Sequence, residues 1–391
     1  MENSNKVPQL SRNDMLSHLP AEILLVILSL LPRSDAAVMR CLSRTWRKLY
    51  DSVFLSFFCD EFDCLGKKEY TRHVKTTLQR RKEKGLESFQ VIWLHKKSDA
   101  WLHYSVHNDA KSIHVIYLRD AWEQHILPDR LLYSGSLEEL AIYSYSRKPE
   151  LAVCDMHLRS LRRLIILSLT IDGDFSYLVS RRCPVLKELY FVSCKLEFKE
   201  LASKSFRNLT IERCCVGTEY TEGSLTINTP KLQHLHYNAV WPDYLRKKQD
   251  RLEYVYDIWT KLDFEIPKLK TLTLGGLWLT GTIHAVDYFL QKSGPLEHLT
   301  FLCNSRAIVS EDISFPCPED LYSSDLKKVE IICWGQDWRA TTLMDILRAH
   351  VHCIEDITEI KFATSKNCFR THTPILKALN HISEWIKDKR Q

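Results

Sequence analysis

The chain has 391 residues, of which 45% are hydrophobic and 26% charged, and its formal net charge is +5. This composition is normal for a folded soluble protein, and the length exceeds one ordinary compact core, which favours two domains or a repeat array. Only 11 residues are glycine, and neither GxGxxG nor GxxxxGK[ST] occurs, so a nucleotide-dependent enzyme is disfavoured.

The cysteine and histidine spacings predict neither a disulfide framework nor a metal site. The 13 cysteines are odd in number and contain no CxxC pair. His234 and His236, like His350 and His352, lie two apart without further ligands at a recognised spacing. We therefore expect no cofactor and no metal. The longest apolar run, 23–31, is short of the roughly 20 residues that span a membrane, so we expect a nuclear or cytoplasmic protein without a membrane partner.

Residues 16–52 carry the patterns of three short helices. In the first, apolar residues recur three and four apart, the spacing of one helix face; they are Ile23, Leu24, Ile27, Leu28 and Leu31. Pro32 ends this helix, and Ser34 and Ser43 can cap the second and third helices. Helices this short cannot bury all of their apolar surface on one another, which predicts a binding partner.

The residue identities of this stretch resemble the F-box motif. The matching positions are Leu19, Pro20, Glu22, Ile23, Ile27, Leu28, Leu31, Pro32, Asp35, Leu42, Ser43, Trp46 and Leu49. The resemblance implies an F-box at 14–58 that docks on the Skp adaptor of cullin–RING ubiquitin ligases. Residues 1–13 are polar and are expected to form a flexible tail. The implied adaptor-binding residues are Leu19, Pro20, Ile23, Leu24, Ile27, Leu28, Leu31, Pro32, Leu42 and Trp46.

A second pattern, apolar-x-x-apolar-x-apolar, recurs through the rest of the chain. Its copies are Leu86/Phe89/Val91, Ala110/Ile113/Val115, Leu137/Leu140/Ile142, Leu161/Leu164/Ile166, Leu186/Leu189/Phe191, Phe206/Leu209/Ile211, Leu232/Leu235/Tyr237, Leu269/Leu272/Leu274, Leu296/Leu299/Phe301, Leu326/Val329/Ile331 and Ile357/Ile360/Phe362. Positions four and six alternate with other residues, so they point to one face of a short strand. Each strand can bury that face only against the next unit, which predicts a solenoid. Cys194, Cys214 and Asn304 are placed to satisfy backbone groups of the turns.

Together with the F-box, these units resemble the plant F-box/leucine-rich-repeat family. The resemblance implies an α/β fold in which a horseshoe with a parallel sheet on its concave face, capped at its C-terminal end, occupies 85–391. It also implies a non-catalytic substrate receptor that binds a Skp-type adaptor, and through it cullin, by the F-box, and an unknown protein substrate by the solenoid.

Positions three and five of each unit alternate with the buried ones, so we expect them on the concave face. In the central units they are Arg163, Ile165, Glu188, Tyr190, Asn208, Thr210, His234, His236, Thr271 and Thr273. Tyrosine and arginine are common in binding hot spots. We therefore predict that Arg163, Glu188, Tyr190, His234 and His236 contact the substrate.

The segment 59–84 is expected to be a linker helix, strongly basic over 67–84, with Val74 and Leu78 inward. Alternatives for it are an import signal, a contact for an acidic partner, or a nucleic-acid site in a scaffold protein that is not part of a ligase. A nucleic-acid site needs stacking aromatics among its cations, and only Tyr70 is available, so a nucleic-acid partner is disfavoured.

Overall fold

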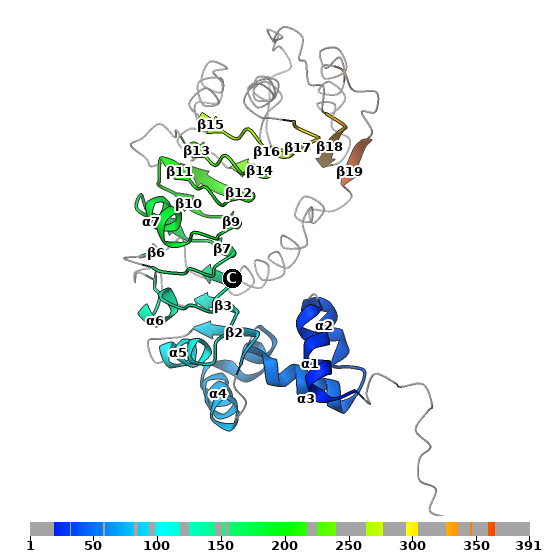
Figure 1. Cartoon of the computed structure of the whole chain (residues 1–391), viewed down its shortest axis with the longest axis vertical. Coiled ribbons are helices and arrows are strands. Elements are labelled where there is room, and N and C mark those ends of the chain that lie inside the picture. Colours follow the sequence, from blue (N-terminus) through cyan, green and yellow to red (C-terminus); the bar gives the residue numbers. More distant parts are fainter. Residues whose placement is uncertain are drawn as a thin grey trace, which may run out of the picture.

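The computed structural model describes a helical unit that leads into a curved stack of parallel strands (Figure 1). The described residues are 19–31, 33–57, 59–81, 85–93, 98–117, 125–144, 151–152, 156–216, 225–239, 263–276, 295–303, 326–334, 345 and 359–363. The expected flexible tail at 1–13, Pro32, Asn304 and the C-terminal cap that follows residue 363 lie outside them.

The helical unit consists of α1 (Ala21–Leu30), α2 (Arg33–Met39) and α3 (Arg44–Val53). Ser43 caps α3 as expected, since its hydroxyl accepts a hydrogen bond from the Trp46 amide at 3.3 Å. α2 begins at Arg33, one residue before Ser34, the residue expected to cap it. The buried core of the unit is made by Leu24, Leu28, Ala36, Trp46 and Tyr50.

The main sheet follows the order β1-β2-β3-β5-β7-β9-β12-β14-β16-β17-β18-β19, and all of these pairings are parallel. Its strands are β1 (Phe54–Phe57), β2 (Ser88–Trp93), β3 (Ser112–Tyr117), β5 (Glu139–Ser144), β7 (Arg163–Leu167), β9 (Glu188–Val192), β12 (Asn208–Val216), β14 (His234–Ala239), β16 (Thr271–Gly276), β17 (His298–Cys303), β18 (Lys328–Trp334) and β19 (Glu359–Ala363). Each predicted unit falls on one of these strands, so the solenoid prediction is confirmed.

Shorter elements return the chain between the strands of the main sheet. The helices α5 (Asp99–His107), α6 (Asp129–Leu132) and α7 (Phe175–Arg182) lie on the outer side of the curve (Figure 1). Short parallel ladders follow the strands: β4 (His125–Ile126) with β6 (Leu151–Ala152), β8 (Thr170–Ile171) with β10 (Lys195–Leu196), and β11 (Glu200–Ala202) with β13 (Thr226–Asn228) and β15 (Asp263–Glu265). The core therefore fills the space between the main sheet and these elements.

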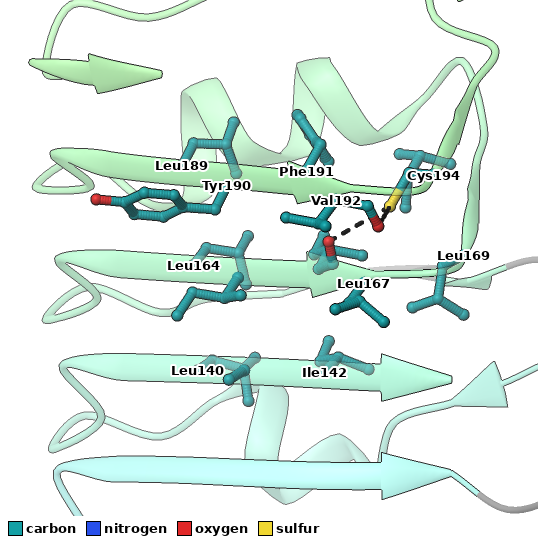
Figure 2. Packing of buried hydrophobic residues seen from close by; sticks show 14 of the residues in the cluster. Leu140, Ile142, Leu164, Leu167, Leu169, Leu189, Tyr190, Phe191, Val192 and Cys194 are labelled. Atoms are coloured by element: carbon teal, nitrogen blue, oxygen red, sulfur yellow. Dashed lines mark hydrogen bonds between the residues drawn. The ribbon is translucent and has the colours of Figure 1, made fainter. Parts of the chain in front are cut away.

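In Figure 2 the in-register side chains at positions four and six, such as Leu164 and Leu189, stack from strand to strand. At the end of β9 the chain turns through Ser193, whose φ is +55°, and buries Cys194. The Cys194 Sγ lies 3.4 Å from the carbonyl oxygens of both Ile166 and Val192, and its single S–H is shared between these two acceptors. The predicted role of Cys194 in satisfying turn backbone groups is confirmed.

The sequence predicts an F-box that ends at residue 58 and a solenoid that begins at residue 85, with a linker helix between them. β1 follows α3 directly and pairs with β2, so residues 54–57 already form a strand of the solenoid. The segment expected as a linker is α4 (Cys59–Arg80), with a break at Gly66, whose φ of +69° is left-handed. Tyr70, Val74 and Leu78 of α4 are buried in the solenoid core, which confirms the inward direction of the last two.

Candidate interaction surfaces

The first candidate surface is the outer face of α1 and α2. Large apolar side chains are exposed on these helices and in the residues just beside them: Leu19 (36% exposed), Ile23 (47%), Val26 (54%), Val38 (64%) and Leu42 (57%). A small helical unit that keeps this much apolar surface in water is expected to bind a partner. Val26 and Val38 were not predicted, although Val26 lies three residues after Ile23 and could have been found from helix spacing.

Three residues assigned to the adaptor surface lie elsewhere. Leu24, Leu28 and Trp46 are at most 1% exposed and form the core of the helical unit, so they support the surface from behind. A helix of ten residues has one face for its own core, and the spacing of apolar residues alone does not separate that face from a partner-binding stripe. Ile27 and Leu31 are partly buried at the boundary between the two faces.

The second candidate surface is the concave face, where the strand register aligns the predicted residues in two rows. The first row contains Arg163, Glu188, Asn208, His234 and Thr271, and the second contains Ile165, Tyr190, Thr210, His236 and Thr273. Neighbouring residues of a row lie one strand apart, about 4.8 Å. The parallel register thus brings together residues 20 to 37 positions apart in the chain.

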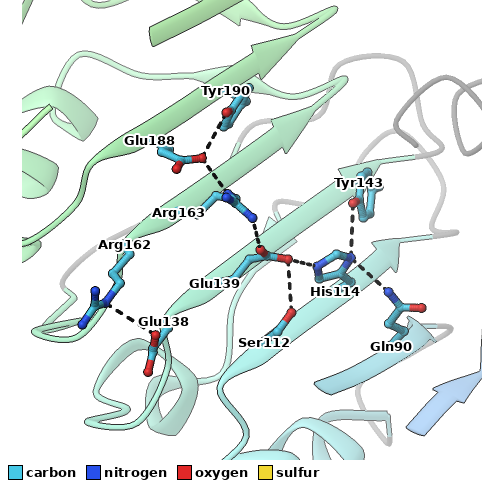
Figure 3. A network of polar contacts seen from close by, with 10 residues as sticks. All are labelled: Gln90, Ser112, His114, Glu138, Glu139, Tyr143, Arg162, Arg163, Glu188 and Tyr190. Carbon is cyan, nitrogen blue, oxygen red and sulfur yellow. Dashed lines mark hydrogen bonds and ion pairs between the residues drawn. The ribbon is translucent and has the colours of Figure 1, made fainter. Parts of the chain in front are cut away.

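A network of polar side chains crosses the first half of this face (Figure 3). The Arg163 guanidinium donates hydrogen bonds at 2.8 Å to the carboxylates of Glu139 and Glu188. Glu139 also accepts from the Ser112 hydroxyl and contacts a ring nitrogen of His114. Because carboxylates bind its guanidinium on both sides, Arg163 links β7 to the neighbouring strands β5 and β9. Its guanidinium is thus already bound within the protein before any substrate arrives.

The network changes the acidity of Glu139. Burial raises the pKa of this carboxyl, but hydrogen bonds and positive charge from His114 and Arg163 outweigh burial and lower the pKa to about 2. Glu139 is therefore ionised throughout the physiological range of pH.

Several concave residues are less accessible than the alternation of the strands predicts. Ile165, Tyr190, Thr210 and His236 are only 3%, 5%, 5% and 7% exposed. Tyr190 donates a hydrogen bond to Glu188 at 3.1 Å. Side chains on adjacent parallel strands stand close enough to cover one another, so a position that faces away from the core is not necessarily accessible.

The two histidines of β14 differ in their surroundings. His236 contacts the buried carboxylate of Glu212 at 2.8 Å, whereas His234 is exposed. Partial desolvation and the positive charges of Lys270 and His298 lower the pKa of His234 below its ordinary value of 6.5. Of the five predicted contact residues, only Arg163, Glu188 and His234 keep accessible surface, and their contact with a substrate stays a prediction.

The third candidate surface, the basic segment 67–84, loses its stacking aromatic. Tyr70 is fully buried, and its hydroxyl donates to the Phe57 carbonyl oxygen at 2.6 Å and accepts from the Ile92 amide at 2.7 Å. Cations such as Lys67 and Lys68 remain exposed, but the nearby Tyr70 ring is not accessible. The nucleic-acid interpretation of this segment therefore loses its main chemical support.

Within the described ranges, no group of three or more His, Cys, Asp or Glu side chains is arranged to hold a metal ion. In the same part of the chain, none of the helices is both long and apolar enough to cross a membrane.

Comparison with known families agrees with this architecture. Residues 16–56 match the F-box domain, and residues 98–253 match the model described as FBD-associated F-box protein At5g56370, LRR repeats. The matched segments contain α1 to α3 and the strands β3 to β14, respectively. The fold and the matches define the class of protein as an F-box followed by leucine-rich repeats.

Its relatives are plant proteins of the same class. The F-box/LRR-repeat protein At3g03360 of Arabidopsis thaliana is 26% identical over 51% of this chain and 42% of its own length. The F-box/FBD/LRR-repeat protein At2g04230 of Arabidopsis thaliana is 29% identical over 58% of this chain and 54% of its own length. The chain thus spans about half the length of the curated relatives that it matches.

Proposed function

We propose that this chain is the substrate-recognition subunit of a Skp–cullin–F-box ubiquitin ligase and carries out no chemistry itself. The observation that carries this proposal is the exposed apolar surface of α1 and α2 on a helical unit whose own core is closed. The match of this unit to the F-box domain supports a Skp-type adaptor as the partner of that surface.

In this function the solenoid holds the protein substrate while the F-box holds the adaptor. The rate of ubiquitin transfer rises because the substrate is kept at a high effective concentration near the charged enzyme. A short rigid connection between the two surfaces suits such a role, and the direct passage from α3 into β1 provides one. A nuclear or cytoplasmic location remains a prediction, which imaging of a fluorescent fusion tests.

Titration of the purified full chain with a Skp-type adaptor tests the adaptor site. Burying one aliphatic side chain contributes about 1.5–3 kcal/mol, and a buried unpaired carboxylate costs more than that. Ile23→Asp and Val26→Asp should therefore each weaken adaptor binding at least tenfold. Val185→Asp is the matched control, because Val185 is similarly exposed, at 40%, but lies in the solenoid.

Unchanged adaptor affinity in both F-box variants would remove the adaptor from this surface. An equal loss of affinity in Val185→Asp would show that the effect is not local to α1.

A further inference from the structure

A groove of about 810 Å³ lies between α7 and the loops that lead into β12 and β14. Five cations line it: Arg181, Lys187, Lys204, Arg207 and Lys231. No aspartate or glutamate is among the described lining residues, and none of the five cations forms an ion pair with a described residue. We call this feature the basic groove.

The register of the sheet places two of these cations, Lys187 and Arg207, side by side. The residue just before each strand forms its own row, in which, from Glu138 onward, each amide donates to the carbonyl oxygen of the preceding member. We call this the entry row; it runs Glu87, Lys111, Glu138, Arg162, Lys187, Arg207, Gln233, Lys270, Glu297 and Lys327.

Near both ends of the entry row, neighbouring members carry opposite charges and form ion pairs. The Lys111 ammonium lies 2.7 Å from the Glu87 carboxylate, and the Glu297 carboxylate accepts from Lys270 and Lys327 at 3.1 and 2.9 Å. From Arg162 onward the alternation fails and three cations follow one another: Arg162, which pairs with Glu138, and then Lys187 and Arg207. Like charges on adjacent strands repel, so this pair costs stability and is best explained by an anionic ligand.

The composition of the basic groove favours a polypeptide as that ligand. Pro184, Val185 and Pro230 give it an apolar lining, and no aromatic side chain is among the described lining residues. Single-stranded nucleic acid is usually held by stacking on aromatics, which the described lining lacks. An isolated phosphate would contact only part of this volume.

The spacing of the cations also fits an extended peptide. Lys187, Arg207 and Lys231 precede three successive strands, which lie about 4.8 Å apart. The span is roughly 10 Å, the length of about three extended residues. Side chains on one face of an extended peptide recur every second residue, so carboxylates two residues apart can meet cations of this set.

We propose that the basic groove binds an extended acidic segment of a partner protein, with its carboxylates on these five cations. The identification of that partner as the substrate of the ligase rests on the function proposed above. Substrate binding would then involve the entry side of the strands as well as the concave face.

Fluorescence anisotropy of a fluorescein-labelled hexaglutamate peptide with the full chain tests this proposal. We expect saturable binding that weakens as salt is added, because exposed charges are screened. Lys187→Glu with Arg207→Glu should weaken binding at least tenfold. The matched control is Lys67→Glu with Lys68→Glu, which changes the net charge equally at exposed positions of α4 and should alter affinity less than twofold.

The milder pair Lys187→Gln with Arg207→Gln keeps the test valid if the charge reversal disturbs folding, and the same direction of effect is expected. Equal losses in the groove and control variants, tighter binding of a labelled oligouridine, or full displacement by inorganic phosphate at equal concentration would each overturn the proposal. Peptide binding is measured without adaptor, so loss of adaptor binding alone would refute only the ligase function.

Discussion

Arg81 donates two hydrogen bonds to the main-chain carbonyl oxygen of Ser52 near the end of α3, at 3.2 Å from Nε and 2.8 Å from Nη2. The same guanidinium reaches the Tyr104 hydroxyl and the Asn108 side-chain oxygen, each at 3.3 Å. A cation at the carboxyl end of a helix satisfies carbonyl groups that have no partner within the helix. Arg81 therefore joins the last F-box helix to the first repeat.

Replacing Arg81 tests this connection. Hydrogen bonds from charged groups contribute about 1.5–3 kcal/mol when buried, and less where water screens them. Arg81→Ala should thus lower the free energy of unfolding by about 2 kcal/mol in denaturant titrations. Arg80→Ala, at an exposed position one residue earlier, should change it by less than about 0.5 kcal/mol. Indistinguishable midpoints for the two variants would rule out the connection.

The buried hydroxyl of Tyr70 supports a second prediction. Tyr70→Phe leaves the Phe57 carbonyl and the Ile92 amide without this partner, and each unsatisfied buried group costs about 1–3 kcal/mol. We expect a loss of about 2–4 kcal/mol and faster hydrogen exchange at the Ile92 amide. Tyr177→Phe, at an exposed tyrosine, is the control and should leave both quantities unchanged. Unaltered exchange at Ile92 in the Tyr70 variant would contradict the bridge.

The fold was largely predictable because the apolar positions of the repeating unit indicate which side chains of each strand are buried. Phe89 and Val91 of β2, for instance, are both fully buried as the unit requires. The missed strand β1 has buried residues at positions four and six, Leu55 and Phe57, but position one is Ser52, which belongs to α3. Position one of this unit therefore lies in the helix and is polar, so β1 lacks the apolar residue that marks the start of the other units.

The separation of core and surface in the F-box gives a third prediction. Leu28→Ala should lower the stability of the full chain by about 2–5 kcal/mol, because it leaves a cavity in a closed core. Ile23→Ala should cost little stability, since Ile23 is 47% exposed, yet it should weaken adaptor binding. Thermal melts and adaptor titrations of both variants measure these effects. A similar loss of stability in the two variants would place Ile23 in the core as well.

The pKa of Glu139 predicts how stability depends on acid. The folded state lowers this pKa from 4.5 to about 2, so the stabilisation is complete above about pH 4.5 and is lost as pH falls towards 2. At pH 7, Glu139→Gln should remove on the order of 2–3 kcal/mol of stability and flatten the profile in that window. Glu138→Gln is the exposed control and should keep the wild-type profile. An unchanged acid profile for Glu139→Gln would refute this assignment.

The domain boundary gives a fifth prediction. A chain that starts at residue 54 keeps β1 and α4, so it should retain a cooperative thermal transition. A chain that starts at residue 85 uncovers the surface against which Phe57, Tyr70 and Val74 are buried, and each lost side chain removes about 1.5–3 kcal/mol. It should melt at least several degrees lower. Circular dichroism of both chains measures this, and equal melting temperatures would return the boundary to residue 84.

The interaction surfaces were only partly predictable. Alternation along each strand predicts Arg163 and Tyr190 on the face opposite the core positions, but it could not show that Tyr190 is only 5% exposed. The basic groove was missed because its cations are up to 50 residues apart, from Arg181 to Lys231, and meet only through the register of the sheet. A signal was present in position two of the unit, which is cationic in three successive copies: Arg162, Lys187 and Arg207.

The direct passage from α3 into β1 constrains how such a protein can evolve. In the described part of the chain, β1 is the edge of the main sheet, and it is continuous with the F-box helix before it. A repeat duplicated at this point would separate Arg81 from Ser52 and move the adaptor surface away from the repeats. Gain or loss of repeats is therefore expected downstream of β2, where a new unit lengthens the array without altering the adaptor end.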